Sequence, residues 1–325
     1  MSRLKILVTG GAGFIGSHLV DSMLADGHRV IVVDNFDPFY DRSIKERNIK
    51  QHLEFANYDL VEADIRNRET MFEIFNKYKP EVVVHLAAKA GVRPSLEDPL
   101  SYVEVNINGT VHLLDASVQY GVKKFIFASS SSVYGLNEKV PFSEEDPILR
   151  QASPYGATKA SCEALCRSYS NCYGLPIAAL RFFTVFGPRQ RPDLAIHKFA
   201  KKILNKEVIQ LFGDGTTSRD YTYVDDIVQG IKSTINYCTT GFEVFNLGND
   251  RPTQLIELVN CLENVLEKKA DIQWLPEQIG DVPRTWANIS KSKELLNYQP
   301  QVDMLTGLEL FASWLNPDLA LLKNN

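Results

Sequence analysis

Tyr155 and Lys159 are the side chains of this chain best suited to moving a proton, because they stand four residues apart. Residues at this spacing share one face of a helix, so the phenol and the ammonium group would lie side by side. A nearby positive charge favours the phenolate and lowers the pKa of a tyrosine from its usual value near ~10. Such a pair could take a proton from a hydroxyl group. The same spacing occurs on ordinary solvated helices, so whether this pair transfers a proton depends on the segments that would position it.

The amino-terminal segment has the pattern of a nucleotide-binding turn. An apolar run at residues 6–8 is followed by a helical pattern, and between them stand three glycines, Gly10, Gly13 and Gly16. Glycines in front of a helix leave backbone N–H groups open to a diphosphate, and the positive end of the helix dipole attracts the same group. We therefore predict that this turn binds the diphosphate of a dinucleotide.

A second apolar run, residues 30–33, ends in Asp34, close to the interval after Gly16 that is expected of a dinucleotide site. A carboxylate there binds a ribose diol and repels the extra phosphate of NADP, which favours NAD. Parallel sheets bind ligands at the carboxyl ends of their strands, where this chain has several small and polar residues. From their positions we expect cofactor contacts with Phe14, Ile15, Asn35, Asp64, Ile65, Leu86, Ala87 and Ala88.

Predicted strands and helices alternate through the first half of the chain. This order predicts an α/β fold with a doubly wound parallel sheet of the Rossmann type. The 325 residues exceed the usual core of a single domain. Beyond residue 184 prolines, arginines and turn residues replace the alternation, which suits a loop-built substrate site. We predict a Rossmann domain at residues 1–180, to which later segments return, and a smaller α/β carboxyl-terminal substrate domain at residues 181–325.

The net charge is −5 with acidic and basic residues interspersed, so we expect neither nucleic acid nor a membrane as a partner. No run approaches the roughly 18 apolar residues of a membrane span, and residues 1–5 lead into the first strand without a secretory hydrophobic region, which predicts a cytoplasmic location. Three of the five cysteines follow Tyr155 at helical spacings and are interpreted as small buried residues: Cys162, Cys166 and Cys172. No histidine stands near them, so we expect no metal site.

Four consecutive serines, residues 129–132, follow the strand predicted at residues 124–128. At the carboxyl end of a parallel strand their hydroxyls could hydrogen-bond a sugar or a reacting oxygen, although a serine-rich loop or helix cap is the plain alternative. Arg219 lies in a later segment rich in turn residues. Its guanidinium group could bind phosphate oxygens, although a lone arginine is more often a solvated surface residue.

Together these segments resemble the extended short-chain dehydrogenase/reductase superfamily, and within it the nucleotide-sugar epimerases and dehydratases. The resemblance covers nearly the whole chain and is carried by residues 9–16, 34, 64–65, 86–88, 106–110, 129–135, 155–159, 181–187 and 213–226. It implies a tightly bound NAD and a carboxyl-terminal domain that holds a UDP- or dTDP-sugar. It also implies a homodimer formed by the helices that follow Pro99 and Tyr155.

The same resemblance assigns roles to particular residues. Tyr155 would be the base on a sugar hydroxyl, Ser130 would donate a hydrogen bond to the same oxygen, and Lys159 would orient the nicotinamide ribose. Asn106 would join the cofactor contacts. Arg219 would contact the diphosphate, and Arg284 would belong to another wall of the sugar-nucleotide site.

The serine segment narrows the set of reactions that the resemblance allows. Dehydratases of this superfamily carry Asp-Glu beside the catalytic residue, and UDP-glucuronate decarboxylases typically carry a glutamate before Val-Tyr-Gly. This chain has Ser131 and Ser132 there, so the acid and base that expel water are missing. Residues 182–188 and 191–193 resemble UDP-glucuronate 4-epimerases instead. The resemblance thus implies an NAD-dependent isomerase that converts UDP-glucuronate to UDP-galacturonate through a bound 4-keto sugar.

An acidic sugar would need a carboxylate site. The hydroxyls of Ser131, Ser132 and Thr184 could form it with one cation, for which we favour Arg191 over Arg189. Oxidation at carbon 4 makes a β-keto acid, which loses carbon dioxide readily unless its carboxylate is held in a protected orientation.

Two departures from the epimerase pattern keep other substrates open. Arg189 and Gln190 stand where many UDP-glucuronate epimerases have Trp-Gly, and Asn288 stands where an aspartate is usual. The alternatives are a UDP-glucose/galactose 4-epimerase, a UDP-glucuronate decarboxylase and, more remotely, a noncatalytic NAD-binding regulator.

Overall fold

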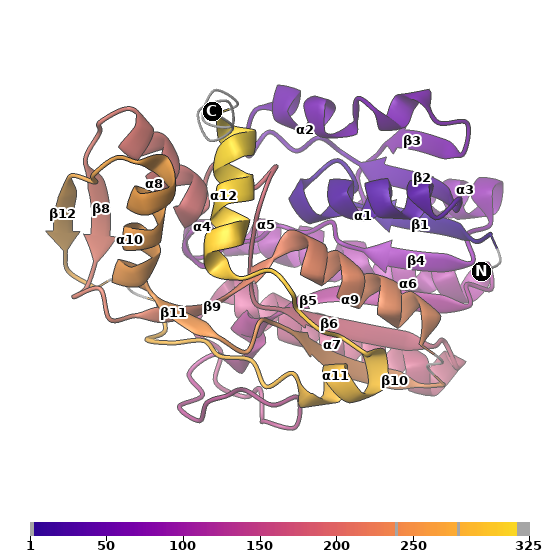
Figure 1. Cartoon of the computed structure of the whole chain (residues 1–325). Coiled ribbons are helices and arrows are strands. Elements are labelled where there is room, and N and C mark those ends of the chain that lie inside the picture. Colours follow the sequence, from indigo (N-terminus) through magenta and orange to yellow (C-terminus); the bar gives the residue numbers. More distant parts are fainter. Residues whose placement is uncertain (1–2, 238–239, 278–279, 317–325) are drawn as a thin grey trace.

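The computed structural model describes residues 3–237, 240–277 and 280–316, and its centre is one parallel sheet (Figure 1). The seven strands lie in the order β3-β2-β1-β4-β5-β6-β10, and every neighbouring pair is parallel. Their bounds are β1 (Lys5–Thr9), β2 (Arg29–Asp34), β3 (Tyr58–Glu62), β4 (Val82–His85), β5 (Lys124–Ser130), β6 (Ile177–Phe182) and β10 (Phe242–Leu247). The predicted Rossmann-type sheet is confirmed.

Helices cover both faces of this sheet. On one face lie α1 (Phe14–Ala25) and α9 (Val224–Asn236), and on the other α3 (Arg68–Tyr78), α6 (Gly109–Gln119) and α7 (Pro154–Tyr173). Neighbouring strand residues pack into different cores: Ile6 and Val8 with α1 and α9, and Leu7 with α3 and α6. Because both faces are buried, the central strands are apolar throughout rather than alternating.

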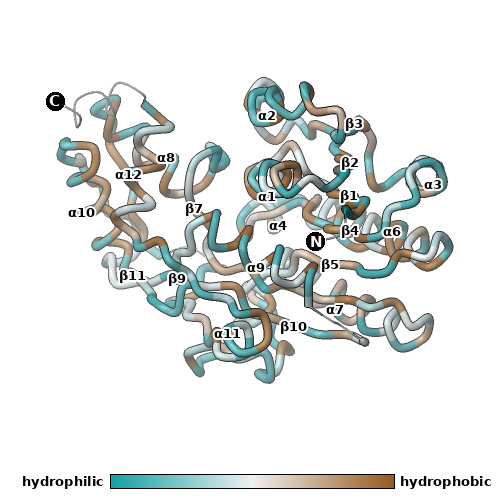
Figure 2. The backbone as a smooth tube through the Cα atoms, turned by 45° about the vertical axis from the view of Figure 1, so that its right-hand side comes forward, coloured by the Kyte–Doolittle hydropathy of each residue, from teal (hydrophilic) through white to brown (hydrophobic). Residues whose placement is uncertain are grey.

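A second group of elements lies beside the sheet and is built mainly from later residues (Figures 1 and 2). It contains a three-stranded sheet, a parallel pair of strands and helices that pack on one another. These are β7 (Thr184–Phe186), β9 (Ser218–Tyr223) and β11 (Pro252–Gln254), then β8 (Ile209–Phe212) and β12 (Ile272–Leu275), and the helices α8 (Ala195–Leu204), α10 (Leu255–Leu266) and α12 (Met304–Leu315). The chain returns from this group to the first sheet with α9, β10 and α11 (Ser290–Leu296).

The helix expected after Pro99 is interrupted. The structure has α5 (Pro99–Tyr102), a π-helical segment η2 (Val103–Asn108) and then α6. In the π-helical turn the carbonyl of Asn106 accepts hydrogen bonds from the side chains of Thr110 and Cys162. Side-chain donors thus take up a carbonyl of the helix interior, which is why the ordinary period fails here.

Residues 290–315 form two helices, because the chain leaves α11 at Asn297, whose φ of 51° ends a helix, and α12 begins only at Met304. Two other expectations are corrected. Strand β5 runs two residues further than predicted and includes Ser130. Cys172 is exposed rather than buried, because it faces outward near the end of α7, whereas Cys162 and Cys166 are buried. Within the described residues no helix is long and apolar enough to cross a bilayer.

A buried ion pair joins α7 to the sheet. Arg181 of β6 donates from Nε and Nη2 to the two carboxylate oxygens of Glu163, at 3.0 and 2.8 Å. Ser129 of β5 donates to the same carboxylate at 2.5 Å, and Tyr134 lies under the guanidinium at 4.8 Å. Because Glu163 is on α7, this cluster fixes the helix against both strands.

Glu163→Ala should destabilise the protein by about 3–5 kcal/mol, because it leaves Arg181 as an uncompensated buried charge. The matched control is Asp59→Ala, which removes the partly exposed partner of Arg29 and should cost roughly 0.2–1 kcal/mol. Urea unfolding of both variants measures the two effects. Equal losses in the two variants would contradict a structural role for the buried pair.

Candidate active site

One large cavity, of about 1300 Å³, lies at the carboxyl ends of the parallel strands and reaches to the second group of elements. Its walls come from the glycine turn and β2 at one end and from β8, β9 and residues 281–283 at the other. A cavity of this size at this edge of a parallel sheet is where the sequence predicted the ligands to meet.

Tyr155, Lys159 and Ser130 all line this cavity. Tyr155 lies in the first turn of α7, whose start is fixed by Pro154 and by Ser153, the hydroxyl of which accepts a hydrogen bond from the Gly156 N–H at 3.2 Å. Lys159 lies one turn further and donates to the Ala128 carbonyl at 2.7 Å. Ser130 ends β5, and its hydroxyl is one of the groups that oppose the rise in the pKa of Tyr155 on burial.

The charges around Tyr155 differ from the expectation. Burial raises the pKa of Tyr155, and the influences that lower this pKa are the Ser130 hydrogen bond and the charge of Arg191. Lys159 instead faces a backbone carbonyl, and burial lowers its own pKa to about 8. In this structure the cation that favours the phenolate therefore comes from a loop far along the chain.

The glycine turn is shaped by close backbone packing. Gly10 has a φ of 72°, in the left-handed region, and a Cβ added at Gly16 would collide with the Gly10 carbonyl. Helix α1 has Gly13 as its N-cap and no side-chain cap, so its first N–H groups stay open to the cavity. This open helix start fits the diphosphate of NAD.

Asp34 ends β2 and is held in place by the backbone. Its carboxylate accepts hydrogen bonds from the N–H groups of Ala12, at 3.1 Å, and Phe36, at 2.9 Å, and lies 3.6 Å from the buried ammonium of Lys45. A fixed carboxylate at the cavity wall fits a ribose diol. The glycine turn and Asp34 together thus fit NAD. When bound, NAD would supply hydride transfer.

Twelve of the residues expected at the cofactor line the cavity: Gly10, Gly13, Phe14, Ile15, Gly16, Asp34, Asn35, Asp64, Ile65, Leu86, Ala87 and Ala88. Asn106 is buried and is not among the lining residues. Its amide accepts from the Lys89 N–H at 2.8 Å and donates to the Lys89 carbonyl and to Thr158, both at 3.0 Å. Asn106 therefore ties the cavity wall to α7 from behind.

His85 is a buried residue that sequence reasoning missed. Its ring nitrogens lie 2.7 Å from the Thr9 hydroxyl and 3.0 Å from the Thr110 hydroxyl. Burial lowers the pKa of His85 to about 3, so the ring is neutral and links β1, β4 and α6 by hydrogen bonds. The Thr9 hydroxyl also accepts from the Ala87 N–H, which fixes the small residues at the end of β4. The only sequence signal was a histidine within an apolar strand.

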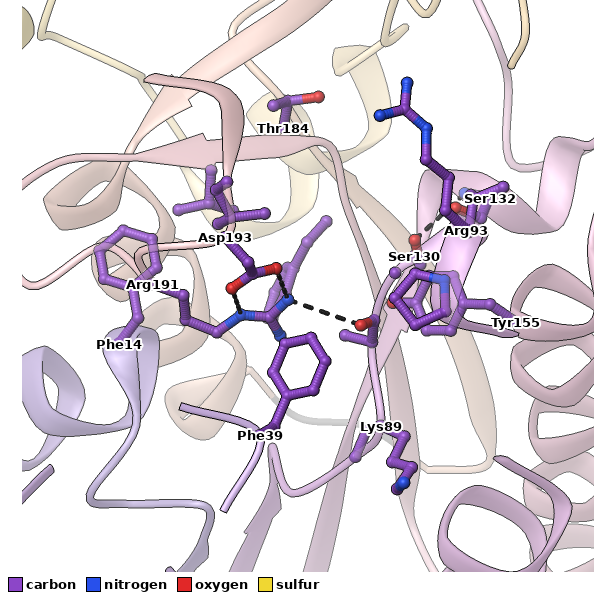
Figure 3. Close-up of a pocket in the computed structure, with 18 of the residues that line it drawn as sticks. Phe14, Phe39, Lys89, Arg93, Ser130, Ser132, Tyr155, Thr184, Arg191 and Asp193 are labelled. Carbon is purple, nitrogen blue, oxygen red and sulfur yellow. Dashed lines mark hydrogen bonds and ion pairs between the residues drawn. The ribbon is translucent and has the colours of Figure 1, made fainter. Parts of the chain in front are cut away.

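Five of the six residues expected at the sugar line the cavity: Ser131, Ser132, Thr184, Arg191 and Arg219. Figure 3 shows Tyr155, Ser130 and Ser132 on one side of the cavity and Arg191 with Phe39 on the other. Arg284 is exposed and lies outside the lining residues, because the wall at this point is formed by residues 281–283. Arg189 also lies outside them and pairs with Asp21 on α1.

Arg191 is paired within the site. It donates from Nε and Nη2 to the carboxylate of Asp193, at 3.0 and 2.7 Å, and its guanidinium lies 5.4 Å from the ring centre of Phe39 (Figure 3). Asp193 was not predicted, although an acid two residues after an arginine was a possible signal. Arg93 was missed for another reason. It joins α4 (Val92–Glu97) to Asp281, 188 residues away, at 3.0 Å, which no local pattern reveals.

The Rossmann-type sheet, the open glycine turn and the Ser130, Tyr155 and Lys159 cluster define the class as the extended short-chain dehydrogenase/reductases. A family model described as GDP-mannose 4,6 dehydratase matches residues 7–311, and the chain belongs to that family.

Individual relatives of the chain have more specific names than the family model. The chain is 40% identical to a UDP-glucuronate 4-epimerase of Thermodesulfobacterium geofontis, over 98% of each chain. The crystal structure of a UDP-glucuronic acid 4-epimerase from Bacillus cereus, in complex with UDP-glucuronic acid and NAD, is 37% identical with a TM-score of 0.91, over 98% of this chain and 100% of that one. A UDP-glucose 4-epimerase from Thermotoga maritima, crystallised with UDP-glucose, is also 37% identical with a TM-score of 0.89, over 97% and 100%.

The lowered pKa of Lys159 predicts a pH-dependent stability. The folded protein holds fewer protons at Lys159 than the unfolded chain between pH about 8 and 10.5, so this residue stabilises the fold increasingly as the pH rises through that window. Relative to Lys159→Met, the free energy of unfolding of the wild type should rise by roughly 2–3 kcal/mol from pH 7 to pH 10. Urea unfolding without added cofactor measures it. A difference that stays constant with pH would contradict a buried, easily deprotonated ammonium.

Proposed function

We propose that this protein is an NAD-dependent 4-epimerase that converts UDP-glucuronate to UDP-galacturonate through a bound 4-keto sugar. The observation that carries the proposal is one cavity lined by Tyr155, Ser130 and Arg191, in which the Ser130 hydroxyl and the Arg191 charge oppose the rise in the pKa of Tyr155 on burial. A base for a sugar hydroxyl and a cation for a sugar acid thus face the same cavity. The relatives named as UDP-glucuronate 4-epimerases match the chain over nearly its whole length.

Tyr155 would act as the base and then as the acid. Its phenolate accepts the proton of the 4-hydroxyl while Ser130 donates a hydrogen bond to the same oxygen, and the phenol later returns that proton to the 4-oxygen. When bound, NAD would supply the chemistry that removes a hydride from carbon 4 and, once the ketone has rotated, returns it to the opposite face of that carbon. Lys159 would hydrogen-bond the cofactor ribose. No net oxidation results, and the product keeps every carbon.

Arg191 and the hydroxyls of Ser131, Ser132 and Thr184 would hold the carboxylate on carbon 5. A 4-keto uronic acid is a β-keto acid, and it loses carbon dioxide when the bond to the carboxylate stands perpendicular to the plane of the ketone. Several hydrogen bonds and one cation keep that bond in a protected orientation. Arg219, which lines the other end of the cavity, would contact the diphosphate.

Within the GDP-mannose 4,6 dehydratase family, Ser131 and Ser132 argue against elimination of water, since neither can act as a strong acid or base near neutral pH. A UDP-glucose/galactose 4-epimerase is the second candidate. Its support is the Asp193 carboxylate, which already neutralises Arg191, so a neutral hydroxymethyl group at carbon 5 would leave no unpaired buried cation. The UDP-glucose 4-epimerase from Thermotoga maritima has the same identity to this chain as the epimerase from Bacillus cereus.

We also propose a homodimer formed by α7 and the segment from α5 to α6, and a cytoplasmic location. The side chains of Leu100 and Val103 on that segment are exposed apolar groups, which supports a contact between subunits. Sedimentation equilibrium would measure the subunit number.

Purified protein incubated with UDP-glucuronate should form UDP-galacturonate without release of carbon dioxide, because oxidation and reduction both occur at carbon 4. NMR of the nucleotide sugars and a carbonate assay measure the two outcomes. A UDP-pentose product would instead assign decarboxylation. Turnover of UDP-glucose alone would assign the second candidate.

Tyr155→Phe should lower kcat by about 10²- to 10⁴-fold, because it removes the group that accepts and returns the proton. Bound NAD and the unfolding midpoint should stay near those of the wild type. The control is Tyr173→Phe, which removes an exposed phenolic hydroxyl from the same helix and should leave kcat unchanged. A Tyr155→Phe enzyme with wild-type turnover would exclude this tyrosine as the base.

A further inference from the structure

The loop of residues 187–193, which carries Arg191 into the cavity, is also bound to the cofactor helix. Arg189 donates from Nη1 to Asp21 of α1 at 2.7 Å, and the other oxygen of Asp21 lies 2.5 Å from Nε2 of the buried His52. One turn earlier on α1, His18 binds the Pro188 carbonyl through Nε2 at 2.9 Å. We call His18, Asp21 and Arg189 the α1 clamp.

The backbone of the loop separates Arg189 from Arg191. Arg189 has a φ of 62°, a left-handed conformation that is strained for a residue with a Cβ. The Gln190 N–H donates to the Gly187 carbonyl at 3.2 Å, and the His197 ring lies 2.7 Å from the Gln190 carbonyl oxygen. In this tight turn Arg189 faces α1, Gln190 is buried and Arg191 faces the cavity.

The α1 clamp therefore connects two parts of the site whose relative position matters, the cofactor helix and the loop that carries Arg191. The first turn of α1 belongs to the glycine turn that fits the cofactor, and Asp21 and His18 lie further along the same helix. Arg191 follows the clamped residue by two positions and is held at its tip by Asp193. Without the Asp21 contact, Arg189 would lose its partner on α1, and the strained turn would be held by His18, by His197 and by its own hydrogen bonds. Arg191 would then be less firmly placed.

We propose that Arg189 is a positioning residue which, through Asp21, fixes Arg191 at the carboxylate of the sugar. The inference rests on the proposed function for the identity of that carboxylate. The position of Arg191 relative to the cofactor helix sets the direction in which the carboxylate is held while carbon 4 is oxidised.

The test compares an acidic and a neutral sugar nucleotide. In a Tyr155→Phe background, which prevents turnover, Arg189→Met should weaken binding of UDP-glucuronate about tenfold, equivalent to ~1.4 kcal/mol. Binding of UDP-glucose should change by less than about twofold, because it has no carboxylate for Arg191. Isothermal titration calorimetry measures both. Arg189→Lys should recover part of the loss. The control Arg29→Met removes an arginine whose partner is Asp59, away from the cavity, and should change neither affinity.

In the enzyme that keeps Tyr155, the share of turnovers that release carbon dioxide gives a second test. Arg189→Met should release carbon dioxide in a larger share of turnovers than the wild type. A double-mutant cycle with Asp21→Asn should be non-additive, because each change breaks the same contact. Equal weakening of UDP-glucuronate and UDP-glucose, or additive effects in the cycle, would overturn the proposal. If the wild type leaves UDP-glucuronate unchanged, the proposed function fails, while the two affinities still test the clamp.

Discussion

The buried carboxylate of Glu163 is the contact on which the catalytic geometry depends. It accepts hydrogen bonds from Arg181 of β6 and Ser129 of β5, so α7 cannot slide along the sheet without leaving a charge unpaired in the core. Two turns earlier the same helix carries Tyr155, and the residue after Ser129 is Ser130. One ion pair thus determines how the hydroxyls of Tyr155 and Ser130 approach each other.

The ionisable side chains of the cavity are each opposed by a partner or by burial. Lys159 is buried against a backbone carbonyl and is easily deprotonated, Arg191 is matched by Asp193, and burial opposes ionisation of Tyr155. The buried ammonium of Lys159 costs stability near neutral pH, because burial disfavours its charged form. Site residues of this kind are preorganised for reaction rather than for folding.

The residues proposed to bind the sugar come from segments distant in sequence. Ser131 and Ser132 follow β5, Thr184 begins β7, and Arg191 lies on a loop that is bound to α1. That loop contacts the cofactor helix on one side and the cavity on the other, so it connects the two regions of the site. Folds of this class change substrate through such loops while the sheet remains the same.

The sequence alone was sufficient for the parts that local patterns encode. Apolar runs, the glycine turn, Asp34 and the Tyr155 and Lys159 spacing predicted the parallel sheet, the cofactor edge and the catalytic helix, because strand and helix periods and turn chemistry act over a few residues. Tertiary structure alone decided the π-helical turn at Asn106, the pairing of Arg191 with Asp193, the contact of Arg189 with Asp21 and the place of Arg284 outside the cavity. Apart from the pair of Arg191 and Asp193, these depend on contacts between residues far apart in the chain. Side-chain pairing across such distances is set by packing and burial, which no local period records.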